Sequence, residues 1–279
     1  MTLATLAQVL RPANALGYAV PGLVCLGWED MRAYVAAAEA ERAPVILQAG
    51  PGCRAHTPLP ILAAMFHHLA ETASVPVVLH LDHGYSLDDC RAALDLGFTS
   101  VMVDGSNLPL AENIALTAAV AKIAHAAGAS CEGEIGFVGY AGGAASAGTD
   151  PKDAARFAAE TGVDAMAISV GNLHLQQSAG AGIDLDRLRA IEAATAVPLV
   201  IHGGSGVPLG QRATLAATSR IAKFNIGTEL RMAFGAALRD GLARDPDQFD
   251  RIALLRGTEA AVTEAARAVM RNLGASGRA

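Results

Sequence analysis

The chain of 279 residues has few aromatic side chains, scattered cysteines and no long apolar segment. Aromatic residues make up 4% of the chain and hydrophobic residues 52%, so the core must be aliphatic. The four cysteines have no CxxC spacing, which argues against a disulfide framework and a thiolate zinc site. The apolar runs are short, and the N-terminus lacks the basic flank and apolar core of a signal peptide. We expect a soluble, cytoplasmic protein with reduced thiols and no membrane partner.

Positive charge is also scarce. The formal net charge is −6, which argues against a general nucleic-acid or anionic-membrane binder. The lysines are Lys122, Lys152 and Lys223, and Lys223 alone lies where it could form an imine with a substrate carbonyl. A polar residue in a strand-end turn is the more frequent role for such a lysine. No GxGxxG follows the first strand-like segment, which weakens a dinucleotide-binding interpretation.

Strand-like and helix-like segments alternate along the chain. An N-terminal helix over 2–14 is expected to close the bottom of the molecule, and the polar tail 274–279 is expected to be mobile or used at a subunit contact. Eight apolar strands at this length predict an α/β fold, a (β/α)8 TIM barrel with extra C-terminal helices, with 1–279 as one domain. The expected strands are 17–25, 44–50, 77–84, 100–104, 129–135, 165–170, 198–202 and 221–226. The expected later helices are 29–42, 59–73, 86–96, 110–127, 228–243 and 258–273.

Three of the expected strands have a histidine at or just after their carboxyl ends. These are His83, His174 and His202, and a closed barrel would bring them together. A single buried histidine is more often structural, but three neutral imidazoles with an open position are a catalytic zinc arrangement. Asp82 precedes the first of them, and it could move a proton on a bound substrate or orient a histidine. The remaining histidines, mid-strand or on helices, are expected to be structural.

Two glycine-containing turns follow the last two expected strands. One is Gly203-Gly204-Ser205-Gly206, and the other is Asn225-Ile226-Gly227-Thr228. Barrels often bind phosphate at these positions through backbone N–H groups and a helix N-terminus. The segment 136–149 is rich in glycine and irregular, which is typical of a lid or a binding loop.

Five motifs in order resemble the class II, zinc-dependent ketose-bisphosphate aldolases, in particular the tagatose-bisphosphate and inositol-catabolic branch. They are LHLDHG at 79–84, GFTSVMVDGS at 97–106, CEGEIG at 131–136, HGGSG at 202–206 and KFNIGTEL at 223–230. The resemblance runs nearly end to end. It implies a lyase of carbohydrate metabolism, a homodimer or homotetramer, that joins or splits dihydroxyacetone phosphate and an aldehyde.

The resemblance also assigns roles to matching residues. It implies that His83, His174 and His202 bind the zinc ion and that Asp82 is the acid at the aldehyde oxygen. Asp104 and Glu134 match carboxylates near an alternative metal position. The residues implied to hold the phosphosugar are Gly171, Gly203, Gly204, Ser205, Asn225, Gly227 and Thr228, with the backbone of Gly171 and Gly203 near a monovalent cation.

The chain departs from the family pattern at its distal end and in its loop. Leu23-Val24-Cys25 replaces an asparagine motif, Gly50 replaces a hydroxyl residue, Leu175 replaces a glycine, and 136–149 contains no acid. We therefore expect a short or non-phosphorylated aldehyde product, with Arg278 the cation available for any second phosphate. Tyr140, water or a substrate hydroxyl would replace the loop glutamate. The alternative is a non-catalytic or enolising phosphosugar-binding barrel, such as a subunit of an aldolase assembly.

Overall fold

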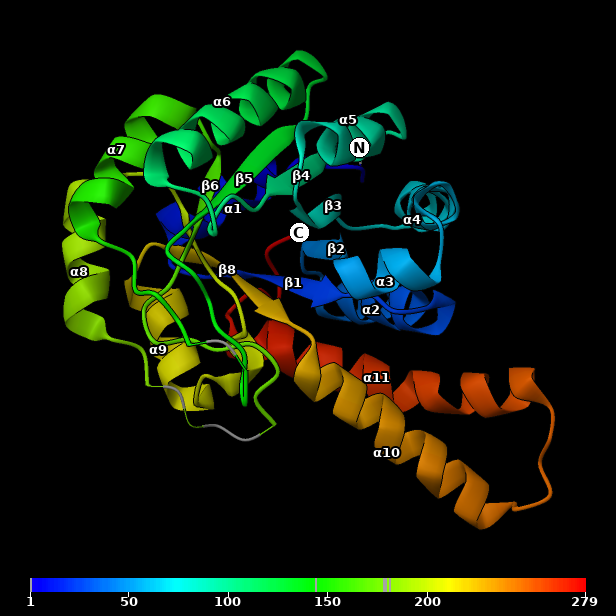
Figure 1. The fold of residues 1–279 in the computed structure, drawn as a ribbon. Coiled ribbons are helices and arrows are strands. Elements are labelled where there is room, and N and C mark those ends of the chain that lie inside the picture. The colour runs from blue at the N-terminus through cyan, green and yellow to red at the C-terminus, as the bar shows by residue number, and fades with distance from the viewer. Residues whose placement is uncertain (1, 144, 178–179, 181) are drawn as a thin grey trace.

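A computed structural model describes residues 2–143, 145–177, 180 and 182–279. Its strands form a closed barrel in which each strand is parallel to its sequence neighbour, and β1 pairs with β8 to close it (Figure 1). This confirms the predicted TIM barrel, and seven of the eight strands are buried along their whole length. The strands are β1 (Val20–Val24), β2 (Val45–Ala49), β3 (Val77–Gly84), β4 (Ser100–Val103), β5 (Ser130–Ile135), β6 (Ala165–Ile168), β7 (Leu199–Ile201) and β8 (Ile221–Ile226).

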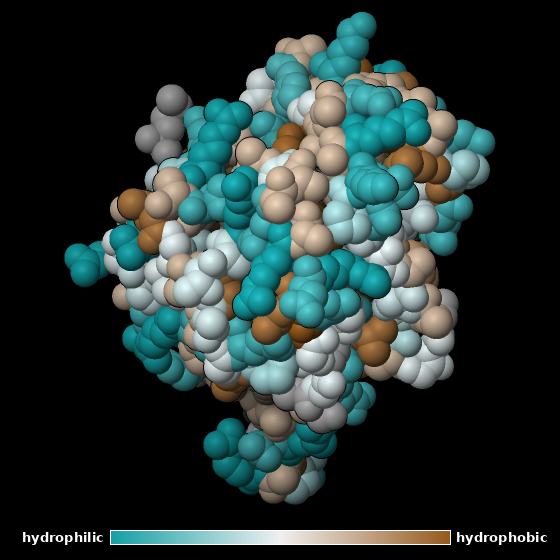
Figure 2. Space-filling view, turned by 90° about the vertical axis from the view of Figure 1, so that its left-hand side faces the viewer, coloured by the Kyte–Doolittle hydropathy of each residue, from teal (hydrophilic) through white to brown (hydrophobic). Residues whose placement is uncertain are grey.

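Helices surround the barrel, and the outward face formed by α7 and α8 is mostly hydrophilic with scattered hydrophobic residues (Figures 1 and 2). No helix in the described ranges is both long and apolar enough to span a membrane. The helices are α1 (Leu6–Leu16), α2 (Trp28–Glu41), α3 (Pro51–His56), α4 (Leu59–Thr72), α5 (Leu87–Asp95), α6 (Leu110–Ala126), α7 (Pro151–Thr161), α8 (Leu185–Ala194), the short 3-10 helix η1 (Gly204–Gly206), α9 (Leu209–Thr218), α10 (Thr228–Arg244) and α11 (Arg251–Asn272).

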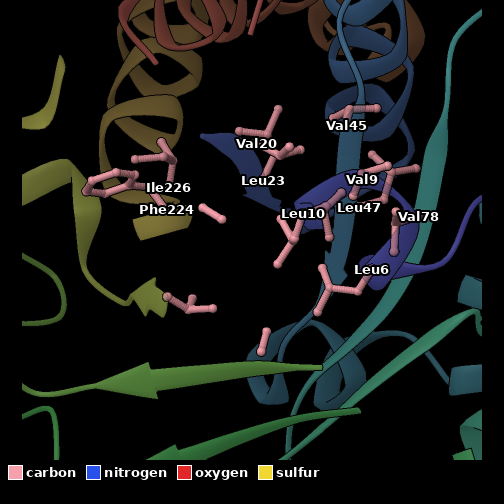
Figure 3. Packing of buried hydrophobic residues seen from close by; sticks show 14 of the residues in the cluster. Leu6, Val9, Leu10, Val20, Leu23, Val45, Leu47, Val78, Phe224 and Ile226 are labelled. Atoms are coloured by element: carbon pink, nitrogen blue, oxygen red, sulfur yellow. The ribbon is translucent and has the colours of Figure 1, made fainter. Parts of the chain in front are cut away.

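Helix α1 closes the amino end of the barrel, as predicted. Thr5 and Gln8 form a capping box that starts it. Leu6 and Leu10 are fully buried, and Figure 3 shows them among the labelled side chains of the core cluster. The Ala7 N–H also donates to the hydroxyl of Ser130, the first residue of β5. The helix therefore seals the end of the barrel opposite the carboxyl ends of the strands.

Two helices differ from prediction for local reasons. The short helix α3 was not expected, since Pro51-Gly52 is typical of a turn; proline is nevertheless tolerated at the first helical position. Helix α11 begins seven residues earlier than expected, at Arg251, because the Asp250 side chain accepts a hydrogen bond from the Ile252 N–H. Helices α10 and α11 thus form a long hairpin that extends away from the barrel (Figure 1).

The C-terminal tail is docked against the amino end of the barrel, and its expected use at a subunit contact stays a prediction. The Gly277 N–H donates to the Glu41 carbonyl at 2.8 Å, and the Ala279 N–H donates to the Arg42 carbonyl at 2.9 Å. The Glu41 carboxylate accepts from Arg271 and from the Ser276 hydroxyl. Small residues in this tail let the backbone come close enough for these bonds.

The carboxylate of Glu41 should make the stability of this docking depend on pH. Hydrogen bonds from Arg271, and then from Ser276 and Arg267, lower the pKa of Glu41 to about 2, whereas an unfolded glutamate has a pKa of about 4.3. Glu41→Gln should lower the free energy of unfolding by about 1 kcal/mol at pH 7, because these partners are partly exposed to solvent. The difference should be complete above the unfolded pKa and disappear as the pH falls through about 2.

Urea titrations at a series of pH values test this, with the exposed Glu71→Gln as control. A difference between Glu41→Gln and the parent that does not change between pH 7 and pH 3 would contradict it.

Candidate active site

The three histidines at strand ends meet at the carboxyl end of the barrel. Ring centroids of His83 and His202 are 4.8 Å apart, and His174 lies 5.7 Å and 5.6 Å from them. One nitrogen from each ring can lie within 4.8 Å of the other two, which is close enough to share one metal ion. Residues that are 91 and 28 positions apart thus form one donor set, as the sequence predicted.

A β-bulge explains how two adjacent residues both reach the site. Neighbouring side chains on a regular strand point to opposite faces. The register between β3 and β4 shifts between Leu81 and Gly84, and His83 has a left-handed backbone with φ 52°. Both Asp82 and His83 consequently line the same pocket.

Hydrogen bonds orient two of the imidazole rings. His83 Nδ1 lies 2.8 Å from Asp104 Oδ2, so its Nε2 is left for another partner. His202 Nε2 lies 3.2 Å from Glu132 Oε1. Among the described residues, His202 Nδ1 is a buried atom with no hydrogen-bond partner. A buried nitrogen without a partner, beside two further imidazoles, fits a metal ligand.

Carboxyl groups gather around His83. Glu134 Oε2 is buried and unpartnered among the described residues, 3.6 Å from His202 Nδ1 and 3.9 Å from His83 Nδ1. Burial and the charge of Asp104 raise the pKa of Glu134 to about 8. Burial alone would lower the pKa of His83, but the charges of Asp82, Asp104 and Glu134 outweigh it and raise the pKa to about 9.

The other two histidines behave differently. Burial, followed by the proximity of His83, lowers the pKa of His174 to about 4 and holds that of His202 well below its usual range. These imidazoles are therefore neutral donors at pH 7, which is the form that binds a metal ion. Neutral nitrogen donors beside several carboxyl groups fit a divalent cation such as zinc.

The pocket above this cluster has a volume of about 290 Å³. Asp82, His83 and His174 lie on its wall, while His202, Asp104 and Glu134 are not part of its lining. The predicted substrate residues that line it are Gly203, Ser205, Asn225, Gly227 and Thr228. The others, Gly171 and Gly204, lie outside the lining.

The two predicted phosphate turns lie side by side in this pocket. Gly203 has φ 65°, and a Cβ atom on it would lie 2.0 Å from the Leu173 carbonyl oxygen, so only glycine fits. Ser205 Oγ accepts from the Glu229 N–H at the start of α10. The amide of Asn225 donates to Asp82 Oδ1 at 3.3 Å. An anion held at the α10 N-terminus would therefore lie next to the Asp82 carboxylate.

Comparison with known proteins agrees with this geometry. Residues 4–278 match the family model described as "Fructose-bisphosphate aldolase class-II". The chain belongs to the class II fructose-bisphosphate aldolase family. Over 288 residues it is 36% identical to the fructose-bisphosphate aldolase of Geobacillus stearothermophilus, covering 100% of this chain and 99% of that protein. The resemblance to the class II aldolases is thus confirmed, and the tagatose-bisphosphate and inositol-catabolic branch stays a prediction.

A second relative and a solved structure are similar over nearly the full length. The probable fructose-bisphosphate aldolase of Bacillus subtilis (strain 168) is 35% identical over 286 residues, covering 100% of both chains. The crystal structure of the YdjI aldolase from Escherichia coli K12 superposes with a TM-score of 0.86 at 31% identity, covering 99% of each chain. Family membership favours the class II aldolase over a barrel that only binds phosphosugars.

The glycine-rich loop of this aldolase is hydrogen-bonded to the segment that follows β6. The Ala141 N–H donates to the His174 carbonyl at 3.0 Å, and the His174 N–H donates to the Gly139 carbonyl at 2.9 Å. The Tyr140 ring stacks on His174 with centroids 4.9 Å apart and lines the pocket. Tyr140 therefore lies on the pocket wall beside His174, and its role in place of a loop acid stays a prediction.

Leu175, which replaces a glycine of the family pattern, has an unusual backbone conformation. Leu175 has φ 58°, a left-handed conformation that leucine adopts only at a cost of about 1–2 kcal/mol. Its side chain is half exposed and lines the pocket. This aldolase thus keeps a strained residue at its active site and gains an apolar wall there.

Sequence reasoning missed two arginines near the pocket and misplaced a third. Arg231 lines the pocket three residues after Thr228, one helical turn into α10. Arg54 donates to the carbonyls of Asp82 and His83 at 2.6 Å and 2.9 Å.

Arg278 lies over Tyr18, which precedes β1, so it is at the opposite end of the barrel. The unrecognised helix α3 hid Arg54, whereas its position after the phosphate turn could have revealed Arg231.

Lys223 does not face the pocket and is fully buried. Its Nζ atom lies 2.6 Å from Glu132 Oε2. An ammonium committed to a buried carboxylate is not available to form an imine. This agrees with a structural role for Lys223.

Proposed function

We propose that this class II aldolase is zinc-dependent and reversibly cleaves a phosphorylated ketose into dihydroxyacetone phosphate and an aldehyde. His83, His174 and His202 would hold the zinc ion. The observation that carries this proposal is the arrangement of these nitrogen donors beside Asp82 and the two phosphate turns. Asp104 and Glu134 lie close enough to His83 to form the alternative metal position. A monovalent cation near the backbone of Gly171 and Gly203 stays a prediction.

Zinc in this site supplies a Lewis acid for the negative charge that develops beside a carbonyl when a carbon–carbon bond breaks. The protein's own part begins with Asp82. Its carboxylate takes the proton from the hydroxyl that becomes the aldehyde, and Tyr140, water or a substrate hydroxyl gives a proton to the carbon left by the broken bond. Both transfers run in reverse in the condensation direction. Asn225 keeps this carboxylate in place through the bond to Oδ1.

The phosphate of the ketose is placed by the chain between Ser205 and Thr228. Backbone N–H groups at the start of α10 and the two hydroxyls donate to the phosphate oxygens. Anchoring one end fixes how far the reacting carbons lie from Asp82, so that binding energy is used for orientation. Tyr140 covers the side of the pocket next to His174.

The proposed function is tested by metal content and cleavage activity together. The purified enzyme should contain about one zinc ion per chain and release dihydroxyacetone phosphate from a ketose phosphate. Removal of zinc with a chelator should abolish cleavage, and added zinc should restore it. Full cleavage by metal-free enzyme would refute zinc dependence.

Arg231 is the one arginine lining the pocket among the described residues, and this predicts how substrates are ranked. The relatives are named for fructose bisphosphate, but here Gly50 offers no hydroxyl, and Arg54 is occupied by backbone carbonyls. We expect kcat/KM for ketose 1-phosphates to equal or exceed that for fructose or tagatose 1,6-bisphosphate. Arg231→Met should lower kcat/KM for bisphosphates by roughly 10-fold, the value of one charge-assisted hydrogen bond, and leave 1-phosphates nearly unchanged.

Steady-state kinetics on a panel of these sugars checks this ranking, with Arg239→Met on the same helix as the matched control. A parent enzyme with a strong preference for bisphosphates would contradict it.

The α10–α11 hairpin is the surface through which we expect copies of this chain to associate. Phe249 at its tip is 93% exposed and Ile252 is 67% exposed, which is unusual for large apolar side chains. Light scattering should give the mass of a dimer or tetramer for the parent and that of a monomer for Phe249→Asp/Ile252→Asp. Leu16→Asp, at an exposed leucine on α1, is the control. A monomeric parent would contradict this proposal.

A further inference from the structure

A buried ion pair lies inside the barrel, next to the histidine cluster. Glu132 on β5 and Lys223 on β8 have no exposed surface, and Lys223 Nζ is 2.6 Å from Glu132 Oε2. Lys223 Nζ is also 3.3 Å from His80 Nε2, and His80 Nδ1 is 2.8 Å from Ser100 Oγ. None of these four residues lines the pocket, so substrate does not contact them.

The donors and acceptors of this cluster allow one consistent assignment. An ammonium only donates, so His80 Nε2 accepts and its Nδ1–H donates to Ser100. A carboxylate only accepts, so the second oxygen of Glu132, Oε1, must receive a hydrogen from His202 Nε2 at 3.2 Å. His202 therefore carries its hydrogen on Nε2, and the lone pair is on Nδ1, the buried atom without a protein partner.

We propose that Glu132 and Lys223 are positioning residues that fix the tautomer and the direction of His202 for zinc binding. The inference rests on the proposed zinc site. Glu132 holds the ring through Nε2, and Lys223 provides the positive charge that a buried carboxylate requires. Ser100 and His80 fix the position of Lys223 from the other side.

Stability alone does not account for this ion pair. Taking both charges out of water costs several kcal/mol per ion, and apolar residues of similar volume often replace such a pair without loss of stability. The same replacement here would remove the acceptor that orients His202. The ion pair should therefore matter more for metal affinity than for folding.

Two double variants separate these effects. Glu132→Leu/Lys223→Met and Glu132→Gln/Lys223→Met both remove the two charges, but only the glutamine keeps an oxygen acceptor for His202 Nε2. Zinc affinity, measured by competition with a chromogenic chelator, should fall 10–100-fold in the leucine variant and stay within about threefold of the parent in the glutamine variant. The visible spectrum of bound Co²⁺ should change in the leucine variant alone.

The melting temperatures of the metal-free proteins provide the structural readout. Thr258→Val, which removes a buried hydroxyl far from the site, is the control that should lower stability without changing zinc affinity. If the leucine variant does not fold, Glu132→Met/Lys223→Met replaces it, because methionine adapts to irregular space. Parent-like zinc affinity in either folded apolar variant overturns this inference alone, as does an equal loss in the glutamine variant. A parent that binds no zinc overturns it together with the proposed function.

Discussion

Alanine at His83, His174 or His202 should remove zinc and cleavage activity together. Catalytic zinc sites have three protein ligands, so each loss leaves too few ligands to retain the metal. The turnover number should fall by on the order of 10³–10⁴, because the Lewis acid contributes several kcal/mol to stabilising the developing charge. Elemental analysis and a coupled assay for dihydroxyacetone phosphate measure both quantities on the same sample.

His125→Ala is the matched control, since this histidine pairs with Asp164 on the outside of the barrel. It should keep zinc and activity at the level of the parent. A triple alanine variant of the three ligands that still contains one zinc per chain would show that the metal binds elsewhere.

Replacing Asp82 with asparagine should separate proton transfer from metal binding. The amide has the same shape and can still contact Asn225, so the fold and zinc content should stay unchanged. It cannot accept the substrate proton, and the turnover number should fall by roughly 10²–10⁴ while KM changes little.

Zinc content, far-ultraviolet circular dichroism and steady-state kinetics decide this prediction. Asp88→Asn, at an exposed position at the start of α5, serves as control. If Asp82→Asn loses zinc but is fully active once the metal is replenished, Asp82 only orients a neighbouring histidine.

The barrel and the histidine set could be predicted because each depends on local patterns. Apolar runs such as Val77–Leu81 are bounded by proline and by polar residues, and their repetition indicates a parallel sheet. Once the barrel closes, the carboxyl ends of all strands must converge, so strand-end residues such as His174 and His202 meet without any further information. The position of each histidine relative to its strand was therefore enough to predict that the three would form one site.

Features that depend on single backbone angles or on long-range partners could not be predicted. The left-handed turn at His83 has no sequence signal, because glycine usually fills such positions. Glu132 was expected only as part of a motif, and its pairing with Lys223 joins residues 91 positions apart. Arg278 was misplaced because a polar, glycine-containing tail resembles a mobile one until its contacts with Glu41 and Tyr18 are known.

The docked tail has a practical consequence for laboratory work on this enzyme. Chemistry is confined to the carboxyl ends of the strands, whereas Ala279 is hydrogen-bonded at the far end of the barrel. A purification tag or fusion partner attached after Ala279 would begin beside the Arg42 carbonyl, at the end of the barrel away from the catalytic groups. Libraries that randomise the pocket around Gly50 and Arg231 would leave the hydrogen bonds between the tail and α2 intact. Substrate range and expression level can therefore be selected independently.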